Sequence, residues 1–249
     1  MNIGALAVAF SVVIPVYNEV ENLEALTEEL RRVLGRQPPA EILLVDDGST
    51  DDIVTRFVDL QRRDGAPVRL VRHARNRGQS AAIVSGVTAA SGTIIVTMDG
   101  DGQNDPADLP RLLDIYRQEF PAGVRLVAGQ RERRRDSLLR RVSSVVANRV
   151  RSRVLGDGIA DTGCGLKVFD RETFLGIPPF DHMHRFLPAL FMSRGARVLA
   201  VPVTHRPRLH GISKYGVGNR LWVGIVDLFG VRWLTRRRIE TSDIFEGPL

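Results

Sequence analysis

Two carboxylates and a side-chain amide follow a strongly apolar stretch near the middle of the chain. Residues 93–98 are apolar or β-branched, and residues 99–106 then read Asp-Gly-Asp-Gly-Gln-Asn-Asp-Pro. Such a run ending in glycine, asparagine and proline predicts a buried strand that stops in a sharp turn. This turn places its polar side chains at the carboxyl edge of a strand, where open α/β sheets bind ligands.

Oxygen ligands at this spacing suit a hard divalent cation. Mg²⁺ or Mn²⁺ held by one or two carboxylates keeps its other positions for water and for phosphate oxygens of a substrate. Asp99, Asp101 and Gln103 therefore predict a cation that joins the protein to a diphosphate. The alternative is that a turn between strand and helix is simply rich in aspartate, asparagine and glycine.

A second carboxylate pair follows an earlier apolar run. Asp46 and Asp47 come directly after residues 41–45, and Ser49 or Thr50 can cap the helix predicted to run to about Arg63. Capping chemistry explains residues 49–52 well and explains Asp46 poorly. Asp46 is therefore a candidate site residue.

The charge of the chain comes almost wholly from arginine. The formal net charge is +6, and Lys167 and Lys214 are the only lysines. Arginine is a planar, bidentate partner of phosphate, so an acidic partner is indicated: a nucleotide, a lipid phosphate, an anionic membrane or a nucleic acid. Residues 131–153 carry nine arginines in a span predicted to be mostly helical, and some of them are expected to meet phosphate.

Strands and helices alternate along most of the chain. The strands are predicted at residues 10–14, 41–45, 68–71, 93–98, 124–128, 166–169 and 197–203, with helical patterns between most of them. This alternation predicts an α/β fold with a mostly parallel sheet and helices on both faces. No Pro- or Gly-rich linker separates a second domain.

The two ends of the chain and its cysteine give further expectations. The single Cys164 excludes an intrachain disulfide and fits a reducing compartment. Residues 1–18 lack a basic region and are interpreted as a short tail and the first strand, not a signal peptide. Residues 217–234 predict an amphipathic helix with two tryptophans that is too interrupted by charge to span a bilayer. It either lies on a membrane surface or packs on the core.

Five motifs in order give the chain a family resemblance. They are residues 15–19 (Pro-Val-Tyr-Asn-Glu), 46–51 (Asp-Asp-Gly-Ser-Thr-Asp), 76–78 (Asn-Arg-Gly), 99–103 (Asp-Gly-Asp-Gly-Gln) and 211–215 (Gly-Ile-Ser-Lys-Tyr). Over residues 10–238 the chain resembles family 2 glycosyltransferases of the GT-A fold, and within them the dolichyl- or polyprenyl-phosphate sugar synthases. The resemblance implies a GT-A, Rossmann-like domain over residues 1–216, and we expect the amphipathic helix and a basic tail over residues 217–249.

The same resemblance implies roles for individual residues. Nucleotide binding is implied for Pro15, Tyr17, Glu19, Asp46 and Asp99, and metal binding for Asp99, Asp101 and Gln103. Arg131, Arg140 and Ser144 are implied to receive the acceptor phosphate, and Arg208, Ser213 and Lys214 to close over the donor phosphates. The expected catalytic set is Asp101, Arg131, Arg140, Arg208 and Lys214. Gln79 departs from the family, which often has lysine at that position.

The expected reaction is metal-assisted transfer of a sugar, with inversion, from a GDP- or UDP-linked donor to a polyprenyl phosphate. Mannose is the first expectation, by family frequency, and a UDP-linked glucose or uronic acid is the next. A phosphate acceptor is already anionic at neutral pH and needs positioning more than a base. We expect a cytoplasmic protein bound peripherally to the membrane, or to a membrane partner, with no nucleic acid.

Two other functions are weighed against this one. A family 2 transferase acting on a hydroxyl would need a general base, for which Asp181 is the candidate. A non-enzymatic nucleic-acid-binding protein would use the arginines on a phosphate backbone but leaves Asp46, Asp99 and Asp101 unexplained. A dinucleotide-dependent oxidoreductase is excluded, since no Gly-x-Gly-x-x-Gly follows a strand.

Overall fold

The structure is a computed structural model that describes residues 10–35, 40–64, 68–131, 149–207 and 220–237. These residues form one seven-stranded sheet with the strand order β3-β2-β1-β4-β6-β5-β7. The strands are β1 (Phe10–Val16), β2 (Ala40–Asp46), β3 (Val68–Arg72), β4 (Ile94–Thr97), β5 (Val124–Arg131), β6 (Lys167–Asp170) and β7 (Arg197–Val203). The predicted α/β fold with a mostly parallel sheet is confirmed.

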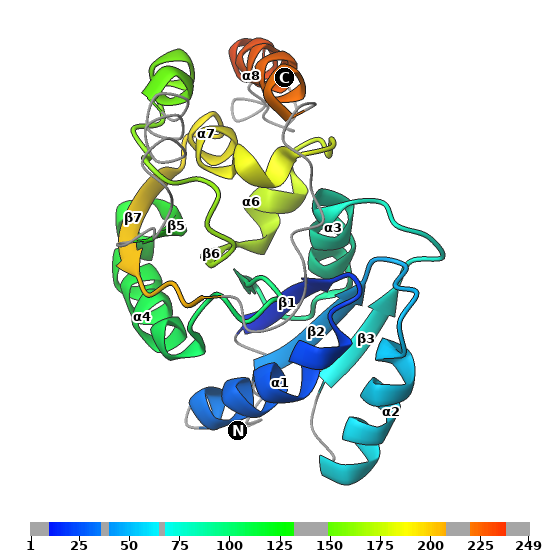
Figure 1. Ribbon diagram of the computed structural model, residues 1–249. Helices are drawn as coiled ribbons and strands as arrows, with labels where there is room; N and C mark the ends of the chain where they lie inside the picture. The colour runs from blue at the N-terminus through cyan, green and yellow to red at the C-terminus, as the bar shows by residue number, and fades with distance from the viewer. Residues whose placement is uncertain (1–9, 36–39, 65–67, 132–148, 208–219, 238–249) are drawn as a thin grey trace, which may run out of the picture.

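Helices cover both faces of the sheet (Figure 1). One face carries α1 (Val20–Leu34), α2 (Ile53–Asp64) and α4 (Leu109–Glu119), whose apolar residues pack against Phe10, Val12 and Ile14 of β1. The other face carries α3 (Gln79–Ala89), α6 (Arg171–Leu175), α7 (Leu187–Met192) and α8 (Arg220–Arg236), which share a core with Val13 and Leu43. Alternate residues of β1 therefore serve opposite layers, as the two-residue period of a strand requires.

One strand runs against the others. β6 pairs antiparallel with β4 and with β5. The strand pairs β1–β2, β2–β3 and β1–β4 are parallel. The register places Lys167 of β6 opposite Thr97 at the end of β4 and opposite Ala128 of β5. Of the segment between β5 and β6, the structure describes residues 149–166, of which residues 149–155 are helical.

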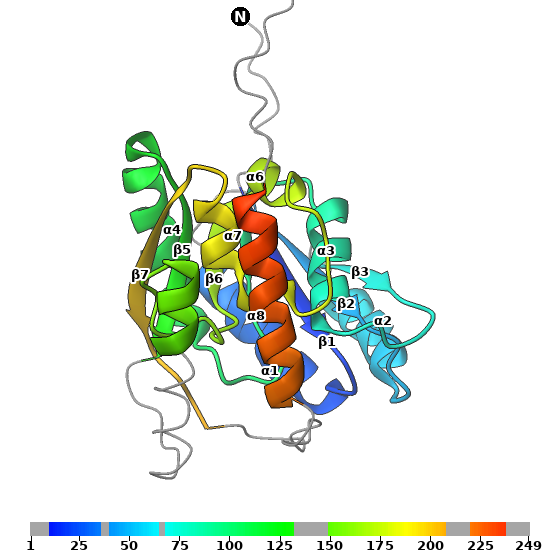
Figure 2. The same ribbon diagram turned by 90° about the horizontal axis from the view of Figure 1, so that it is seen from above.

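α8 lies on the core with part of its surface. Leu228 and Val231 are buried against the α3, α6 and α7 layer, and Arg232 donates to the Val154 carbonyl. Figure 2 shows α8 alongside α7 and residues 149–155. One side of the helix therefore packs on the core, and the alternative of a membrane contact remains a prediction for its exposed side. The predicted division between residues 216 and 217 lies outside the described residues.

None of the helices in the described part of the chain combines the length and the apolar composition that a bilayer span requires.

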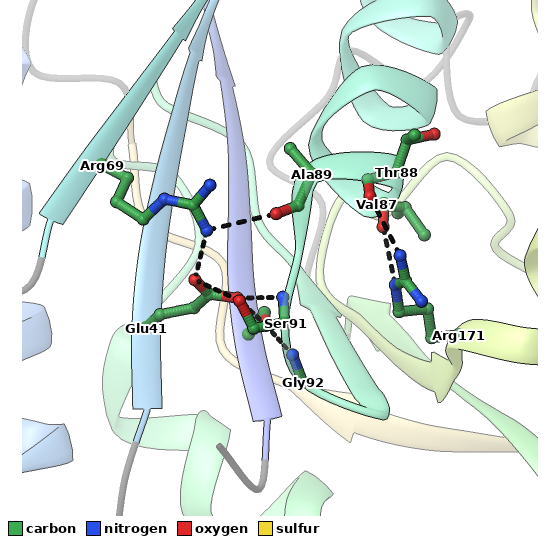
Figure 3. Close-up of polar contacts among 9 residues, drawn as sticks. Glu41, Arg69, Val87, Thr88, Ala89, Ser91, Gly92 and Arg171 are labelled. Carbon is green, nitrogen blue, oxygen red and sulfur yellow. Dashed lines mark hydrogen bonds and ion pairs between the residues drawn. The ribbon is translucent and has the colours of Figure 1, made fainter. Parts of the chain in front are cut away.

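A buried carboxylate fastens the amino-terminal edge of the sheet (Figure 3). Glu41 Oε1 accepts from Ser11 Oγ at 2.6 Å and from the Ser91 amide, and Glu41 Oε2 pairs with Arg69 Nη1 at 2.7 Å. Burial alone raises the pKa of Glu41, but the bonds from Ser11, Ser91 and Arg69 outweigh it, so the pKa is lowered. Next to this network, Arg171 holds the carboxyl-terminal end of α3 by donating to the Val87 and Thr88 carbonyls.

We expect Glu41→Gln to lower the free energy of unfolding by about 1–3 kcal/mol at neutral pH, because it removes a charge that accepts several buried hydrogen bonds. A lowered native pKa adds stability above the unfolded pKa, and that stability is lost as the pH falls through the native value. The difference between wild type and variant, measured by urea unfolding, should therefore shrink below about pH 4. A constant difference across pH would contradict this explanation.

Candidate functional site

The predicted polar residues gather at one edge of the sheet. β1, β2 and β4 are neighbours and parallel, so their carboxyl ends meet there. Tyr17 and Glu19 follow β1, Asp46 ends β2, and Asp99 and Asp101 follow β4. The structure thus brings together five predicted site residues that come from three separate parts of the chain, at the edge where parallel sheets bind ligands.

Asp46 is fully buried, and both of its carboxylate oxygens are engaged. Its Oδ1 accepts from the Ser49 amide at 2.8 Å, and its Oδ2 pairs with Arg72 Nε at 3.0 Å. The backbone carbonyl of Asp46 accepts from the His73 amide. Asp46 therefore organises the loop after β2, and its predicted contact with a nucleotide stays a prediction.

Asp47 joins this loop to the one before α3. It accepts from the Arg77 and Gly78 amides at 2.9 and 2.7 Å, and its Oδ1 lies 2.7 Å from His73 Nδ1. Gly48 has a φ of +73°, and a Cβ there would overlap the Arg75 backbone. Only glycine fits that close approach, which explains why the two loops can lie together.

The loop after β1 is held by hydrogen bonds to the loop after β2. Asn18 has a φ of +51°, its amide donates to Ser49 Oγ at 2.9 Å, and its Oδ1 accepts from the Thr50 amide at 2.8 Å. Glu19 Oε2 accepts from Asn22 Nδ2 at 2.6 Å at the start of α1. Pro15 lies opposite Val45 within the sheet. Side-chain bonds therefore fix the backbone around the predicted nucleotide residues.

Asp99 is enclosed by its neighbours. Its Oδ1 accepts from Gln79 Nε2 at 2.8 Å, and its backbone amide donates to Asn104 Oδ1 at 2.9 Å. A Cβ at Gly165 would overlap the Asp99 carboxylate, so glycine there lets the chain pass directly over it. Gln79, the position where the family often has lysine, thus orients the carboxylate by an amide hydrogen bond.

Asp99 and Asp101 form a strained pair of like charges. Burial first, and then the charge of Asp101, raise the pKa of Asp99 to about 6, although Lys167, Arg131 and Gln79 act in the opposite direction. Two carboxylates that repel each other at a partly closed site are a donor set that a divalent cation neutralises. Asp99 and Asp101 could therefore hold Mg²⁺ or Mn²⁺, and Gln103 lies in the same turn.

The site does not have a ready-made cage of charged ligands. Within the described residues, no three histidine, cysteine, aspartate or glutamate side chains converge as a metal cluster. A cation held by two carboxylates would take its other ligands from an amide, from water or from a substrate. That pattern is usual for Mg²⁺ bound with a phosphate substrate.

The segment after β7 is fastened to the acidic turn. Asn104 and His205 form an isolated antiparallel bridge, and the Arg206 amide donates to the Gln103 carbonyl at 2.8 Å. The Arg206 side chain pairs with Asp105 at 2.7 Å and with Glu29 of α1 at 2.8 Å. His205 is therefore brought beside the turn. None of the sequence patterns described above singled out His205.

Lys167 is a further site residue that sequence reasoning missed. It is 3% exposed, and it donates to the Cys164 carbonyl. Burial lowers the pKa of Lys167, whereas Cys164 and Asp99 raise it. A lysine inside the apolar run 166–169, in a chain that otherwise uses arginine, was the available signal.

Arg131 is the last residue of β5 and is held by Asp161. Arg131 Nε lies 2.7 Å from Asp161 Oδ2, and Arg131 Nη2 lies 2.8 Å from Asp161 Oδ1. The remaining predicted residues, Arg140, Ser144, Arg208, Ser213 and Lys214, lie outside the described residues. Their roles stay predictions.

Comparison with known proteins gives a consistent result. The model of the family described as Glycosyl transferase family 2 matches residues 11–176. The chain is 36% identical over 240 residues to the dodecaprenyl-phosphate galacturonate synthase of Rhizobium johnstonii, covering 94% of this chain and 70% of that protein. It is 36% identical over 208 residues to the undecaprenyl-phosphate 4-deoxy-4-formamido-L-arabinose transferase of Klebsiella pneumoniae, covering 82% of this chain and 62% of that protein.

Solved structures share the fold. The chain superposes on the glucosyl-3-phosphoglycerate synthase of Mycobacterium tuberculosis in complex with Mn²⁺, UDP-glucose and phosphoglyceric acid with a TM-score of 0.66 at 17% identity. That match covers 94% of this chain and 81% of the other. The predicted GT-A-like fold is therefore shared with a solved glycosyltransferase structure over 94% of this chain.

We expect Asp99→Asn to raise the free energy of unfolding at about pH 7.5 by about 1–3 kcal/mol, because it removes a partly desolvated carboxylate that lies beside a second negative charge. The native pKa is raised above the ordinary 3.8, so Asp99 stabilises the fold below that value and the benefit is lost as the pH rises through about 6. Urea unfolding at several pH values should show the advantage of the variant shrinking below about pH 6. If Asp99→Asn were less stable than wild type at about pH 7.5, the explanation that the charged Asp99 destabilises the fold would be wrong.

Proposed function

Since the chain belongs to glycosyltransferase family 2, we propose that it transfers a sugar from a nucleoside diphosphate donor to a polyprenyl phosphate. The observation that carries this proposal is the pairing of opposite charges at one sheet edge. Asp99 and Asp101 suit a cation and the donor's diphosphate, while Arg131 provides a cationic group whose field reaches Asp99. The similarity to the dodecaprenyl-phosphate galacturonate synthase of Rhizobium johnstonii over 94% of the chain supports the lipid acceptor.

The divalent cation is part of this proposal. We propose Mg²⁺ or Mn²⁺ on Asp99 and Asp101, with Gln103 as the third protein ligand. When bound, such a cation offsets negative charge on a leaving diphosphate. The protein's own contribution is to fix Asp99 through Gln79 and Gly165, so that the carboxylate needs little reorganisation.

The reaction needs no general base on the acceptor. A phosphate oxygen of the acceptor attacks the anomeric carbon while the bond from that carbon to the diphosphate oxygen breaks, and the nucleoside diphosphate leaves with the electron pair. Configuration inverts because attack and departure are on opposite faces of the sugar. Arg131, with Arg140 and Ser144 as expected from the sequence, aims the acceptor phosphate, and Arg208 and Lys214 close over the donor.

The sugar is the least constrained part of the proposal. Mannose was the expectation from the sequence, whereas the two relatives described above carry galacturonate and 4-deoxy-4-formamido-L-arabinose in their names. These names favour a donor other than GDP-mannose. We therefore propose a UDP-linked uronic acid or related sugar as the first donor to test, with GDP-mannose in the same panel.

The test is formation of a lipid-linked sugar. Purified protein, a radiolabelled UDP- or GDP-sugar, polyprenyl phosphate and Mn²⁺ should give a product that extracts into organic solvent. Asp101→Asn should reduce that product by about 100-fold or more, because it removes half of the carboxylate pair. Chelation with EDTA should reduce product formation by the wild type in the same way. Added Mn²⁺ should then restore product formation by the wild type but not by Asp101→Asn. No lipid-linked product with any donor would overturn the function.

We also propose that α8 attaches the protein peripherally to a membrane surface. Its inner residues Leu228 and Val231 are buried, whereas Phe229 and Trp233 are each 62% exposed and Val226 is 54% exposed. Arg236 and Arg237 are exposed at the end of the helix. An apolar strip beside cationic residues suits the interface of an anionic bilayer, where the proposed acceptor is found.

The double variant Phe229→Ser/Trp233→Ser should co-sediment with anionic phospholipid vesicles at least about fivefold less than wild type, because it removes the two most exposed apolar side chains among the described residues of the helix. Val58→Ser, an exposed apolar residue on α2, is the matched control and should bind as wild type does. Equal sedimentation of all three proteins would rule out this surface.

A further inference from the structure

The guanidinium of Arg131 is fixed from one side by Asp161. Two hydrogen bonds of 2.7 and 2.8 Å join Nε and Nη2 of Arg131 to the two oxygens of the same carboxylate. The backbone amide of Arg131 also donates to Asp161 Oδ2, at 3.3 Å. The side chains of Arg131 and Asp161 are only 14% and 11% exposed. The pair is therefore forked, largely buried and anchored to the backbone.

This pair lies in the electrostatic field of the acidic turn. The charge of Arg131 counteracts the rise in the pKa of Asp99 that burial and Asp101 cause. Burial would lower the pKa of Arg131, but its hydrogen bonds and charge pairing with Asp161 raise it. Arg131 thus keeps its positive charge close to Asp99, which we propose to hold the cation that binds the donor.

Two hydrogen bonds from one guanidinium to one carboxylate position an arginine for a second anion. A guanidinium has five N–H groups in one plane, and the pair with Asp161 uses two of them. Because both bonds end on one carboxylate, the plane of the guanidinium is set and its rotamers are restricted before any ligand arrives. The other N–H groups of the plane can then meet a phosphate without a search through side-chain conformations.

We propose that Asp161 is a positioning residue for the acceptor, holding Arg131 at the end of β5 so that the guanidinium receives the acceptor phosphate. Asp161 lies 30 residues from Arg131, and β5 and β6 bring the two together. The inference rests on the proposed function, because it assumes a phosphate acceptor. Asp161 itself makes no bond to the substrate in this proposal.

The competing explanation is that Asp161 only balances buried positive charge. Its charge also acts on Lys167 and on Arg151, whose pKa values are both lowered by burial. Removing Asp161 would then lower stability without acting on one substrate in particular. A second buried pair close by offers a matched control: Arg151 Nη1 lies 3.1 Å from Asp157 Oδ2, and both residues are buried.

The experiment compares Asp161→Asn, Asp161→Glu and Asp157→Asn with wild type. Initial rates are measured with Mn²⁺, the productive nucleotide sugar and polyprenyl phosphate in detergent micelles, varying one substrate at a time. Thermal unfolding is followed for each protein. Donor binding is measured separately by calorimetry with Mn²⁺ and the nucleoside diphosphate, in the absence of acceptor.

Positioning predicts an effect confined to the acceptor. Asp161→Asn should raise the KM for polyprenyl phosphate by about tenfold or more, while the KM and Kd for the donor change by less than about twofold. Asp161→Glu keeps the charge but moves the carboxylate, so it should also raise the acceptor KM. Asp157→Asn should lower the unfolding temperature with an acceptor KM within about twofold of wild type.

Other outcomes would overturn the inference. If Asp161→Glu has the acceptor KM of wild type, charge balance alone explains Asp161. If Asp161→Asn raises the donor and acceptor KM values equally, or if Asp157→Asn raises the acceptor KM as much, the role is structural. If Asp161→Asn does not fold, the Glu variant decides. A failure of the proposed function is distinguishable, because wild type itself would then form no lipid-linked product.

Discussion

The repulsion between two carboxylates at the end of β4 is the constraint around which the sheet edge is built. Asp99 loses much of its hydration and lies beside Asp101, which is why its pKa rises to about 6. The neighbouring residues reduce this cost without removing it. Gln79 donates to the carboxylate, Lys167 and Arg131 supply positive charge, and Gly165 leaves the space that the carboxylate fills. The result is a site whose charge is unbalanced in the direction that favours a cation.

The reversed strand connects this edge to the cationic side. Because β6 is antiparallel to β4, its first residue, Lys167, lies opposite Thr97, two residues before Asp99. The same strand pairs with β5, which ends at Arg131. An all-parallel sheet would instead put the first residue of that strand at the opposite edge. The direction of one short strand thus decides which charges face one another.

Much of the fold was predictable from local patterns, and the gaps have physical causes. Apolar runs that end in polar turn residues marked β1, β2 and β4 within two residues, because a buried strand and the turn after it differ sharply in composition. The direction of β6 was not specified, since alternation along the chain gives the order of elements and not the pairing. The acidic turn was found from spacing alone. Lys167, and the pairing of Arg131 with Asp161, depend on contacts between residues far apart in sequence, which no local pattern encodes.

The clamp formed by Glu41, Ser11 and Arg69 lies at the amino-terminal edge of the sheet, away from the carboxyl edge where the acidic turn lies. Cohesion and chemistry are therefore assigned to opposite ends of the same strands. Loops at the reactive end can exchange residues to suit a different donor or acceptor while the network at the far end keeps the strands in register. A scaffold divided in this way can diversify in specificity without a matching loss of foldability.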